Sequence, residues 1–220
     1  MKIAIDGPGG AGKSTLSKKL AKHFNLVYID TGAMYRAAGL ACVRKGINIK
    51  EQPTEAVKIV NASDIDLLPG DTGQKIMLNG EDVTGLIRTP EISMAASDVS
   101  AIPEVRIRLV EMQRKLAETK SVIMDGRDIG TYVLPDAPIK IFLTASPEER
   151  AKRRYLELTE RGDACKYEDV LAELLIRDKN DSTRAFSPLK QAEDSILVDT
   201  SEMNFEESLD YLIKIIQERL

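Results

Sequence analysis

Residues 7–15 read Gly7-Pro8-Gly9-Gly10-Ala11-Gly12-Lys13-Ser14-Thr15, which fits the pattern G-x-x-x-x-G-K-[ST]. Glycines at these positions let the backbone curl so that successive N–H groups point inward onto phosphate oxygens. We expect all nine residues to contact a nucleotide, with Lys13 reaching its β- and γ-phosphates and the hydroxyl of Ser14 binding Mg²⁺. A chance match is the alternative, but an apolar run precedes the loop and a helical pattern follows it. This context predicts a phosphate-binding loop at the N-terminus of a helix, which itself favours anions.

Short apolar runs alternate along the chain with longer helical patterns. The runs are typical of buried strands, and helical periodicity follows the first two over about 13–24 and 32–45. Strands that alternate with helices require parallel crossovers, so the pattern predicts an α/β fold with an open parallel sheet and helices on both faces. Signals for helix starts stand at Thr89, Ser146 and Asn204. The expected strands comprise residues 3–5, 26–29, 121–124, 139–143 and 195–198.

Residues 46–96 interrupt this alternation. They contain a helical pattern, then the apolar runs 64–68 and 75–78, and then Asn79-Gly80, which is a strong signal for a tight turn. Small antiparallel strands are therefore expected inside a parallel-sheet protein. We interpret this stretch as an inserted α/β subdomain beside the ligand site, within a single domain that covers residues 1–220.

The composition suits a globular protein. Of the 220 residues, 43% are hydrophobic and 30% are charged, and the formal charge of −4 argues against general nucleic-acid binding. Cys42 and Cys165 form no C-x-x-C pair, which favours a reducing compartment. The first six residues run directly into the glycine loop, and no apolar stretch approaches membrane-spanning length. We therefore expect a cytoplasmic protein with neither a membrane nor a nucleic acid as partner.

Phosphate loops of this kind occur in GTPase switches, ATP-driven motors and small-molecule kinases. A switch reads guanine with a segment such as N-K-x-D, whereas residues 178–181 read D-K-N-D. A motor usually carries an acidic pair after an apolar strand, whereas Asp125 stands alone before Gly126. A single Asp at a strand end suits the positioning of hydrated Mg²⁺. The pattern favours a kinase, which needs an acceptor site and a lid that excludes water.

A basic cluster opens the helix that is expected after Ser146. For any one of its residues, a solvated helix face explains the charge. Together they flank a Gly-Asp break and indicate a mobile lid over residues 148–165, in which Arg153 and Arg154 contact the nucleotide. The cluster comprises Arg150, Lys152, Arg153 and Arg154, with Arg161 just before Gly162.

A second cluster lies on the helix that is expected from about Tyr167. Val170 and Leu174 mark its inward stripe, and steps of seven lead from them to Arg177, Asp181 and Arg184. Charged side chains on an inward face need partners, because burial of unpaired charge is unfavourable. A phosphorylated ligand with sugar hydroxyls would supply them. The alternative is that these residues pair with one another at an exposed helix end.

The sequence shows no obvious general base. His23, the one histidine, is expected to have a packing or surface role on the first helix. A kinase that acts on an alcohol needs a base, whereas a monophosphate is mostly dianionic at neutral pH, since its second pKa is about 6. The sequence therefore favours a phosphate acceptor, although Asp30 and Asp125 are alternative bases.

Five segments, taken in order, resemble the bacterial-type cytidylate kinases of the P-loop nucleoside monophosphate kinase superfamily. The resemblance covers essentially the whole chain, including the insertion. The combination of D-T-G-A-M-Y-R with D-G-R-D-I-G-T is highly specific, which the phosphate loop alone is not. The segments are residues 5–8 leading into the loop, 30–36, 87–89, 125–131 and 177–184.

The resemblance implies a P-loop NTPase-type fold with a five-stranded parallel core, a monophosphate-binding subdomain at 46–96 and a short lid. It also implies Mg²⁺-assisted, in-line transfer of the γ-phosphate of ATP to CMP or dCMP, without a protein general base. By position, the resemblance implies Arg36, Arg127 and Arg184 for the acceptor phosphate, Thr31, Arg177 and Asp181 for the sugar, and Ser97, Arg106 and Asp128 for the base. Together with the phosphate loop and the strand-end Asp described above, the residues expected to serve catalysis are Lys13, Asp125, Arg127 and Arg184. Thr31 stands where some members have Ser.

Two other functions stay open on the sequence alone. One is a P-loop kinase for another small acceptor such as UMP, and the other is a P-loop NTPase that acts as a switch. For the kinase, we expect a monomer.

Overall fold

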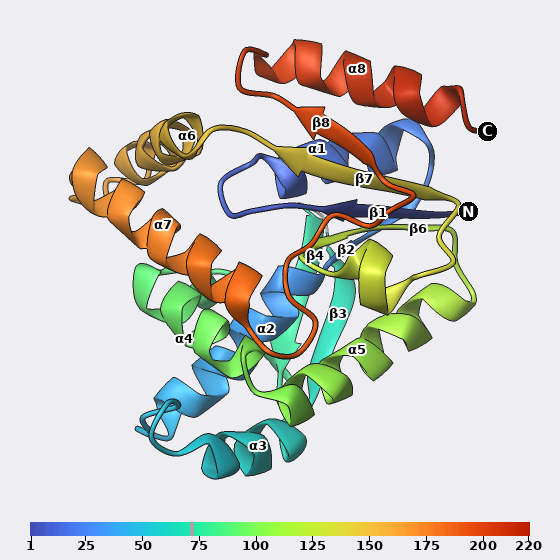
Figure 1. The fold of residues 1–220 in the computed structure, drawn as a ribbon. Coiled ribbons are helices and arrows are strands. Elements are labelled where there is room, and N and C mark those ends of the chain that lie inside the picture. Colours follow the sequence, from blue (N-terminus) through green and yellow to red (C-terminus); the bar gives the residue numbers. More distant parts are fainter. Residues whose placement is uncertain (71–72) are drawn as a thin grey trace. The chain divides into compact units, whose positions relative to one another are not determined.

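The computed structural model describes residues 1–70 and 73–220 of the chain (Figure 1). These residues form two compact units. Unit 1 comprises Met1–Tyr28 and Lys120–Leu220, and unit 2 comprises Ile29–Thr119. Strand β2 (Val27–Asp30) runs across the boundary between them.

Unit 1 is built on a five-stranded sheet with the order β2-β6-β1-β7-β8. The pairs β1–β6, β1–β7 and β7–β8 are parallel, and Ile5 lies opposite both Asp125 and Ile141. The expected parallel sheet of an α/β fold is therefore confirmed. The strands are β1 (Lys2–Asp6), β6 (Val122–Gly126), β7 (Ile139–Thr144) and β8 (Ile196–Asp199), together with β2.

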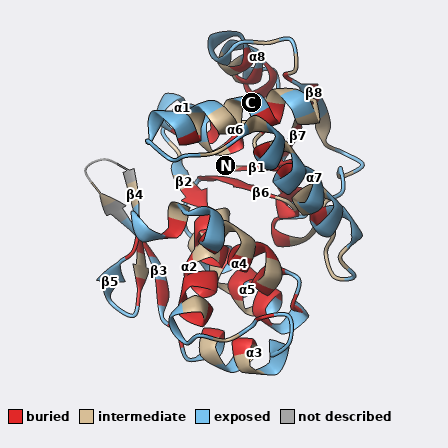
Figure 2. Cartoon of the chain, turned by 90° about the vertical axis from the view of Figure 1, so that its left-hand side faces the viewer, coloured by how far each residue is buried: buried red, intermediate tan, exposed pale blue. Residues whose placement is uncertain are grey.

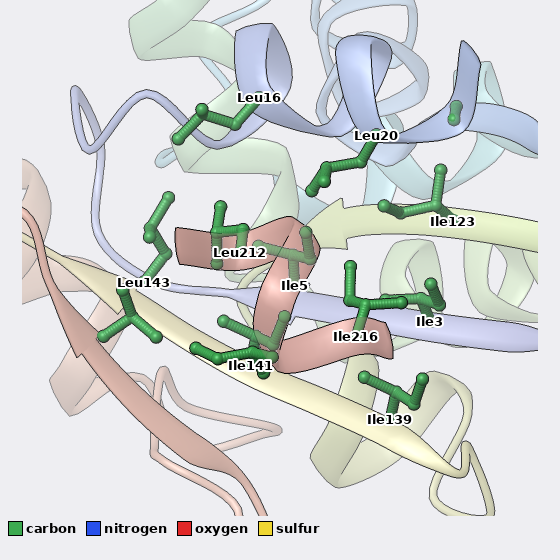
Figure 3. Packing of buried hydrophobic residues seen from close by; sticks show 13 residues of the cluster. Ile3, Ile5, Leu16, Leu20, Ile123, Ile139, Ile141, Leu143, Leu212 and Ile216 are labelled. Atoms are coloured by element: carbon green, nitrogen blue, oxygen red, sulfur yellow. The ribbon is translucent and has the colours of Figure 1, made fainter. Parts of the chain in front are cut away.

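Helices α1 (Lys13–His23) and α8 (Phe205–Gln217) cover one face of this sheet. Their apolar side chains pack on those of the strands in a single core cluster (Figure 3). Successive side chains of a strand point to opposite faces, so Asp6 projects away from this cluster. Its carboxylate accepts hydrogen bonds from η2 (Ile129–Val133), a single turn of π-helix that lies on the other face. The main members of the core are Ile3, Ile5, Leu16, Leu20, Ile123, Ile139, Ile141, Leu143, Leu212 and Ile216.

The predicted helix starts are also found. Ser146 caps α6 (Pro147–Glu160) by accepting from the N–H of Glu149, and Asn204 caps α8 in a reciprocal capping box with Glu207. The hydroxyl of Thr89 caps α4 (Pro90–Ser100). Helix α7 (Tyr167–Thr183) begins at the expected residue and packs on α6.

Unit 2 contains four helices and a second sheet in the part of the chain that the structure describes. Strands β3 (Ile65–Gly70), β4 (Gly73–Leu78) and β5 (Glu81–Asp82) form an antiparallel sheet, as the sequence predicts. Asn79 and Gly80, both with positive φ, make the tight turn between β4 and β5. The predicted insertion 46–96 lies inside this larger unit. The other elements are α2 (Thr31–Arg44), α3 (Pro53–Asn61), η1 (Leu86–Arg88), α4 and α5 (Pro103–Glu118).

Helices α2 and α4 pack closely at a glycine. A Cβ atom on Gly39 would lie 2.9 Å from the backbone nitrogen of Ala96, so a larger side chain would push the two helices apart. Figure 2 shows buried residues along α2, α4 and α5. Within residues 1–70 and 73–220, no helix has the length and apolar character that a membrane span requires.

Candidate active site

The predicted phosphate-binding segment lies in unit 1, where residues 7–12 connect β1 to α1 and Lys13, Ser14 and Thr15 form the first turn of α1. Two of its glycines are required by their surroundings. A Cβ atom on Gly7 would lie 1.9 Å from the carbonyl oxygen of Leu143, and Gly10 has a φ of +75° with the backbone of Arg150 against it. At each of these two positions, only glycine combines a positive φ with room for the neighbouring backbone.

Lys13 opens α1, and its side chain is almost fully buried. Its ammonium group donates a hydrogen bond of 2.7 Å to the carbonyl oxygen of Pro8, within the loop. Burial lowers the pKa of Lys13 well below its ordinary value, and the nearby positive charge of Arg127 lowers it further. Negative phosphate oxygens in the loop would favour the charged form, so the position suits a lysine that binds an anion.

Ser14 lies beside the carboxylate of Asp125, the last residue but one of β6. The hydroxyl of Ser14 donates to Oδ2 at 2.7 Å, and the hydroxyl of Tyr28 donates to Oδ1 at 2.7 Å. The two residues predicted to serve Mg²⁺ are thus brought together within unit 1. A hydroxyl and a carboxylate are the hard oxygen ligands that Mg²⁺ prefers, so the residues present fit this ion.

Four charged side chains form a buried network beside the loop. Asp181 on α7 lies 2.7 Å from Nε of Arg127 and 3.6 Å from a terminal nitrogen of Arg184. Arg184 in turn lies 3.9 Å from Asp128. Burial alone would raise the pKa of Asp181, but Arg127, Arg177 and Arg184 hold it below its ordinary value. The network therefore keeps several positive charges fixed at one place, as binding of a phosphate requires.

The inward stripe predicted on α7 is present in part. Val170, Leu174 and Asp181 are buried, and Arg177 is half-buried. The charged residues do pair with one another, as the alternative interpretation held. However, the side chains of Asp181 and Arg184 are only 7% and 4% exposed, so the pairing is not at an exposed helix end.

Arg150 differs from its expected position on a lid or solvated helix face. Its side chain is 4% exposed, and its guanidinium donates to the carbonyl oxygens of Ala145 and Gly9 and pairs with Asp178 at 2.7 Å. Three acceptors satisfy the charge, two of them, Gly9 and Asp178, from distant segments, which is why burial is tolerated. Arg150 therefore fixes α6 and α7 to the phosphate loop.

Arg153 and Arg154 lie farther along α6 and are partly exposed. Arg153 pairs with Glu149 and donates to the carbonyl oxygen of Thr200 at 2.7 Å, and Arg154 pairs with Glu157 at 2.8 Å. Glu157 also pairs with Arg161. All of these partners lie in unit 1. The expected contacts of Arg153 and Arg154 with the nucleotide stay predictions.

Unit 2 holds the other predicted residues: Thr31 and Arg36 on α2, Ser97 on α4 and Arg106 on α5. Arg106 is 2% exposed and donates to the hydroxyl of Tyr35 at 2.9 Å and to the carbonyl oxygen of Ser100 at 3.2 Å. Asp30 caps α2 by accepting from the N–H of Ala33, and it pairs with Arg88 at 3.5 Å.

Two residues were missed by the sequence reasoning. Asp6 accepts from the backbone N–H groups of Ile129 and Gly130, both at 2.7 Å, and so holds the segment that follows Asp128. Burial raises the pKa of Asp6 to about 6. Ser187, in the turn after α7, donates to Asp128 at 2.6 Å. The place of Asp6 immediately before the loop was a usable signal, whereas nothing in the sequence marks Ser187.

Similar proteins are found both among known sequences and among solved structures. The family model for cytidylate kinase matches residues 3–218. A cytidylate kinase of Caldicellulosiruptor bescii is 54% identical over 213 residues, which cover 97% of this chain and 94% of the relative. A cytidylate kinase of Carboxydothermus hydrogenoformans is 51% identical over 216 residues, which cover 98% and 97%. Among solved structures, an uncharacterized protein from Eubacterium ventriosum shares the fold with a TM-score of 0.56, at 17% identity and over 100% and 99% of the two chains. By these matches the chain belongs to the cytidylate kinase family.

Proposed function

We propose that the chain transfers the γ-phosphate of ATP to the phosphate group of CMP or dCMP, which yields CDP or dCDP. The observation that carries this proposal is the buried arginine network of Arg127 and Arg184 around Asp181, in the same compact unit as Lys13 and the phosphate loop. Phosphoryl transfer requires charge neutralisation and positioning more than covalent chemistry. Membership of the cytidylate kinase family supports CMP as the acceptor.

The proposed roles follow the chemistry of each group. Lys13 and the backbone N–H groups of the loop bind the phosphates of ATP, while Arg36, Arg127 and Arg184 bind the acceptor phosphate. These positive charges are fixed before the reaction, so they stabilise the charge of the transition state without reorganising. The attacking oxygen is already deprotonated at neutral pH, so no protein base is needed. We assign the sugar to Thr31, Arg177 and Asp181, and the base to Ser97, Arg106 and Asp128.

Ser14 and Asp125 are the residues that would hold Mg²⁺. When bound there, the ion would neutralise charge on the phosphates of ATP and orient them. This assignment is supported by two contacts of Asp125 on β6: the hydroxyl of Ser14 on α1 donates to Oδ2 at 2.7 Å, and the hydroxyl of Tyr28 donates to Oδ1 at 2.7 Å.

Water exclusion is the remaining requirement of a kinase. We infer that residues 148–165 act as a lid and that Arg153 and Arg154 exchange their carboxylate partners Glu149 and Glu157 for phosphate when ATP binds. We assign residues 46–96 to monophosphate binding. We expect the enzyme to act as a monomer in the cytoplasm, where both nucleotides are available.

The test is release of ADP from Mg-ATP, followed with CMP, dCMP, UMP, AMP or GMP as acceptor. The proposal predicts almost no ADP without an acceptor and fast turnover with CMP or dCMP. A different preferred acceptor would identify another kinase. Slow turnover that ignores every acceptor would identify an NTPase switch and overturn the proposal.

A further inference from the structure

The turn after α7 contains a serine in an unusual backbone conformation. Ser187 has a φ of +52°, and the other non-glycine residues with positive φ in the described chain, Asn25 and Asn79, are both asparagines. Asparagine tolerates the left-handed region, whereas serine enters it less readily. Pro188 follows directly and favours an extended conformation for the residue before it. Such strain persists only where surrounding contacts fix it, and it is frequent at functional sites.

The contacts of Ser187 reach two residues of the proposed acceptor site. Its hydroxyl donates to Oδ2 of Asp128 at 2.6 Å. Its carbonyl oxygen accepts from Nε of Arg184 at 2.6 Å. Asp128 follows β6 and Arg184 ends α7, so this one serine connects the two segments.

Further contacts hold the turn in place on both sides. The N–H of Leu189 donates to the carbonyl oxygen of Asp181 at 2.8 Å, which closes the turn onto α7. The ring of Phe186 packs edge-to-face on Tyr132 of η2, with centroids 5.2 Å apart. The conformation of Ser187 is therefore fixed by its neighbours as well as by its own hydrogen bonds.

The distance between Asp128 and Arg184 shows why their separate contacts with Ser187 matter. Arg184 and Asp128 approach only to 3.9 Å, which is too long for a hydrogen bond. Ser187 instead accepts the Nε–H of Arg184 and holds one oxygen of Asp128. Arg184 and Asp128 are thus each held by a hydrogen bond to Ser187 and not by one to each other.

We propose that Ser187 is a positioning residue for acceptor recognition, which sets the orientation of Asp128 through its hydroxyl and of Arg184 through its carbonyl oxygen. This inference rests on the proposed function, because it assigns the cytosine base to Asp128 and the acceptor phosphate to Arg184. It predicts an effect on the acceptor and not on ATP.

Two variants separate the hydroxyl from the backbone strain. Ser187→Ala removes the hydroxyl and keeps a side chain that disfavours positive φ, whereas Ser187→Gly removes the hydroxyl and adopts this φ without steric strain. The matched control is Ser182→Ala, an exposed serine of α7 whose hydroxyl bonds only to helix carbonyls. For each protein, KM for CMP and ATP, kcat/KM for CMP and UMP, and Tm are measured.

We expect both Ser187 variants to raise the KM for CMP about tenfold, the scale of one hydrogen bond to a charged group, and to reduce the preference for CMP over UMP. The KM for ATP should stay within about twofold, and Ser182→Ala should match wild type. Ser187→Gly should have the higher Tm of the two, so it keeps the test valid if Ser187→Ala folds poorly.

If the turn had only a structural role, the kinetic constants and Tm values of the variants would differ from these expectations. Ser187→Gly would then show wild-type kinetics, and only Tm would vary among the variants, which would overturn the inference. The proposed function fails separately, if wild-type protein does not phosphorylate CMP at all. An active wild type with unchanged Ser187→Gly overturns only the role of Ser187.

Discussion

The hydroxyl of Ser14 lies 2.7 Å from Oδ2 of Asp125, although 111 positions of sequence separate them. The register of the sheet brings them together, because β1 pairs in parallel with β6 and Ile5 lies opposite Asp125. The carboxyl end of β6 therefore lies next to the loop that leaves β1. This arrangement allows one Mg²⁺ ion to be held by ligands from two separate strand–loop segments.

Ser14→Ala should raise the Mg²⁺ concentration needed for half-maximal activity by about tenfold or more, because it removes an oxygen ligand and the donor that orients Asp125. Tyr28→Phe removes a donor to the same carboxylate but no proposed ligand, so its effect should be smaller. The measurement is initial rate against free Mg²⁺ at saturating ATP. An unchanged Mg²⁺ requirement in Ser14→Ala would remove Ser14 from the metal site.

Lys13→Ala should lower kcat by about 10²–10³ while the protein remains folded, because it removes a charge that stabilises the transferred phosphate. Lys19→Ala, an exposed lysine on the same helix, is the matched control and should retain activity. Circular dichroism checks that the variants are folded, and steady-state kinetics gives their kcat. Turnover of Lys13→Ala within threefold of wild type would exclude this lysine from the mechanism.

Asp181→Asn should both weaken acceptor binding and destabilise the protein. It leaves the half-buried Arg127 without its carboxylate at 2.7 Å, and loss of one partner of a fully buried pair costs about 3–5 kcal/mol, which is the upper bound here. Arg177→Ala should raise the acceptor KM with a smaller loss of stability. Urea unfolding and acceptor kinetics together test this. If both variants lost stability but bound CMP normally, the network would be structural only.

Asp128→Asn should lower the efficiency with CMP and reduce the gap to UMP. Cytosine has an exocyclic amino donor where uracil has a carbonyl acceptor, so an ionised Asp accepts from cytosine and repels uracil. Each mismatched buried polar contact costs about 1–3 kcal/mol, and an Asn can rotate its amide to donate to uracil. The measurement is kcat/KM for CMP and UMP in both proteins. An unchanged ratio would mean that Asp128 serves its contacts to Ser187 and Arg184 and does not read the base.

Asp6 predicts a pH dependence of stability. Its pKa rises from 3.8 to about 6 on folding, chiefly because of burial. The folded state therefore keeps this proton to a higher pH than the unfolded state does. The contribution of Asp6 to the free energy of unfolding is fully present below about pH 3.8, and it is lost as the pH rises through 6. The shift corresponds to about 3 kcal/mol.

Asp6→Asn cannot titrate, so the comparison with wild type isolates this carboxyl group. Urea unfolding of both proteins between pH 3 and pH 8 should show wild type losing about 3 kcal/mol of unfolding free energy relative to the variant. Parallel stability curves would show that Asp6 ionises in the folded protein as it does in the unfolded chain.

Local patterns in the sequence predicted most of the fold and indicated several candidate site residues. The glycine loop, the strand ends and the inward stripe of α7 are short-range signals, and each directly reflects a backbone or burial requirement. Asp125 was identifiable as a candidate because the carboxyl ends of the strands in an open parallel sheet are where ligands usually bind.

The features that were not predicted depend on distant segments. Arg150 lies in a basic run that fits an exposed helix, and its burial depends on the distant acceptors Gly9 and Asp178. Ser187 depends in the same way on Asp128, 59 positions away. A sequence pattern records neither the position of such partners nor a left-handed φ at a serine.

Transfer of phosphate from ATP to CMP can be followed with ATP that is radiolabelled in its γ-phosphate. The labelled ATP is incubated with the enzyme, Mg²⁺ and CMP, and the products are separated by chromatography. We expect the label to appear in CDP, in an amount equal to the ADP formed, and to stay in ATP when CMP is omitted. Label released as inorganic phosphate at the same rate with and without CMP would show that the enzyme is not a CMP kinase.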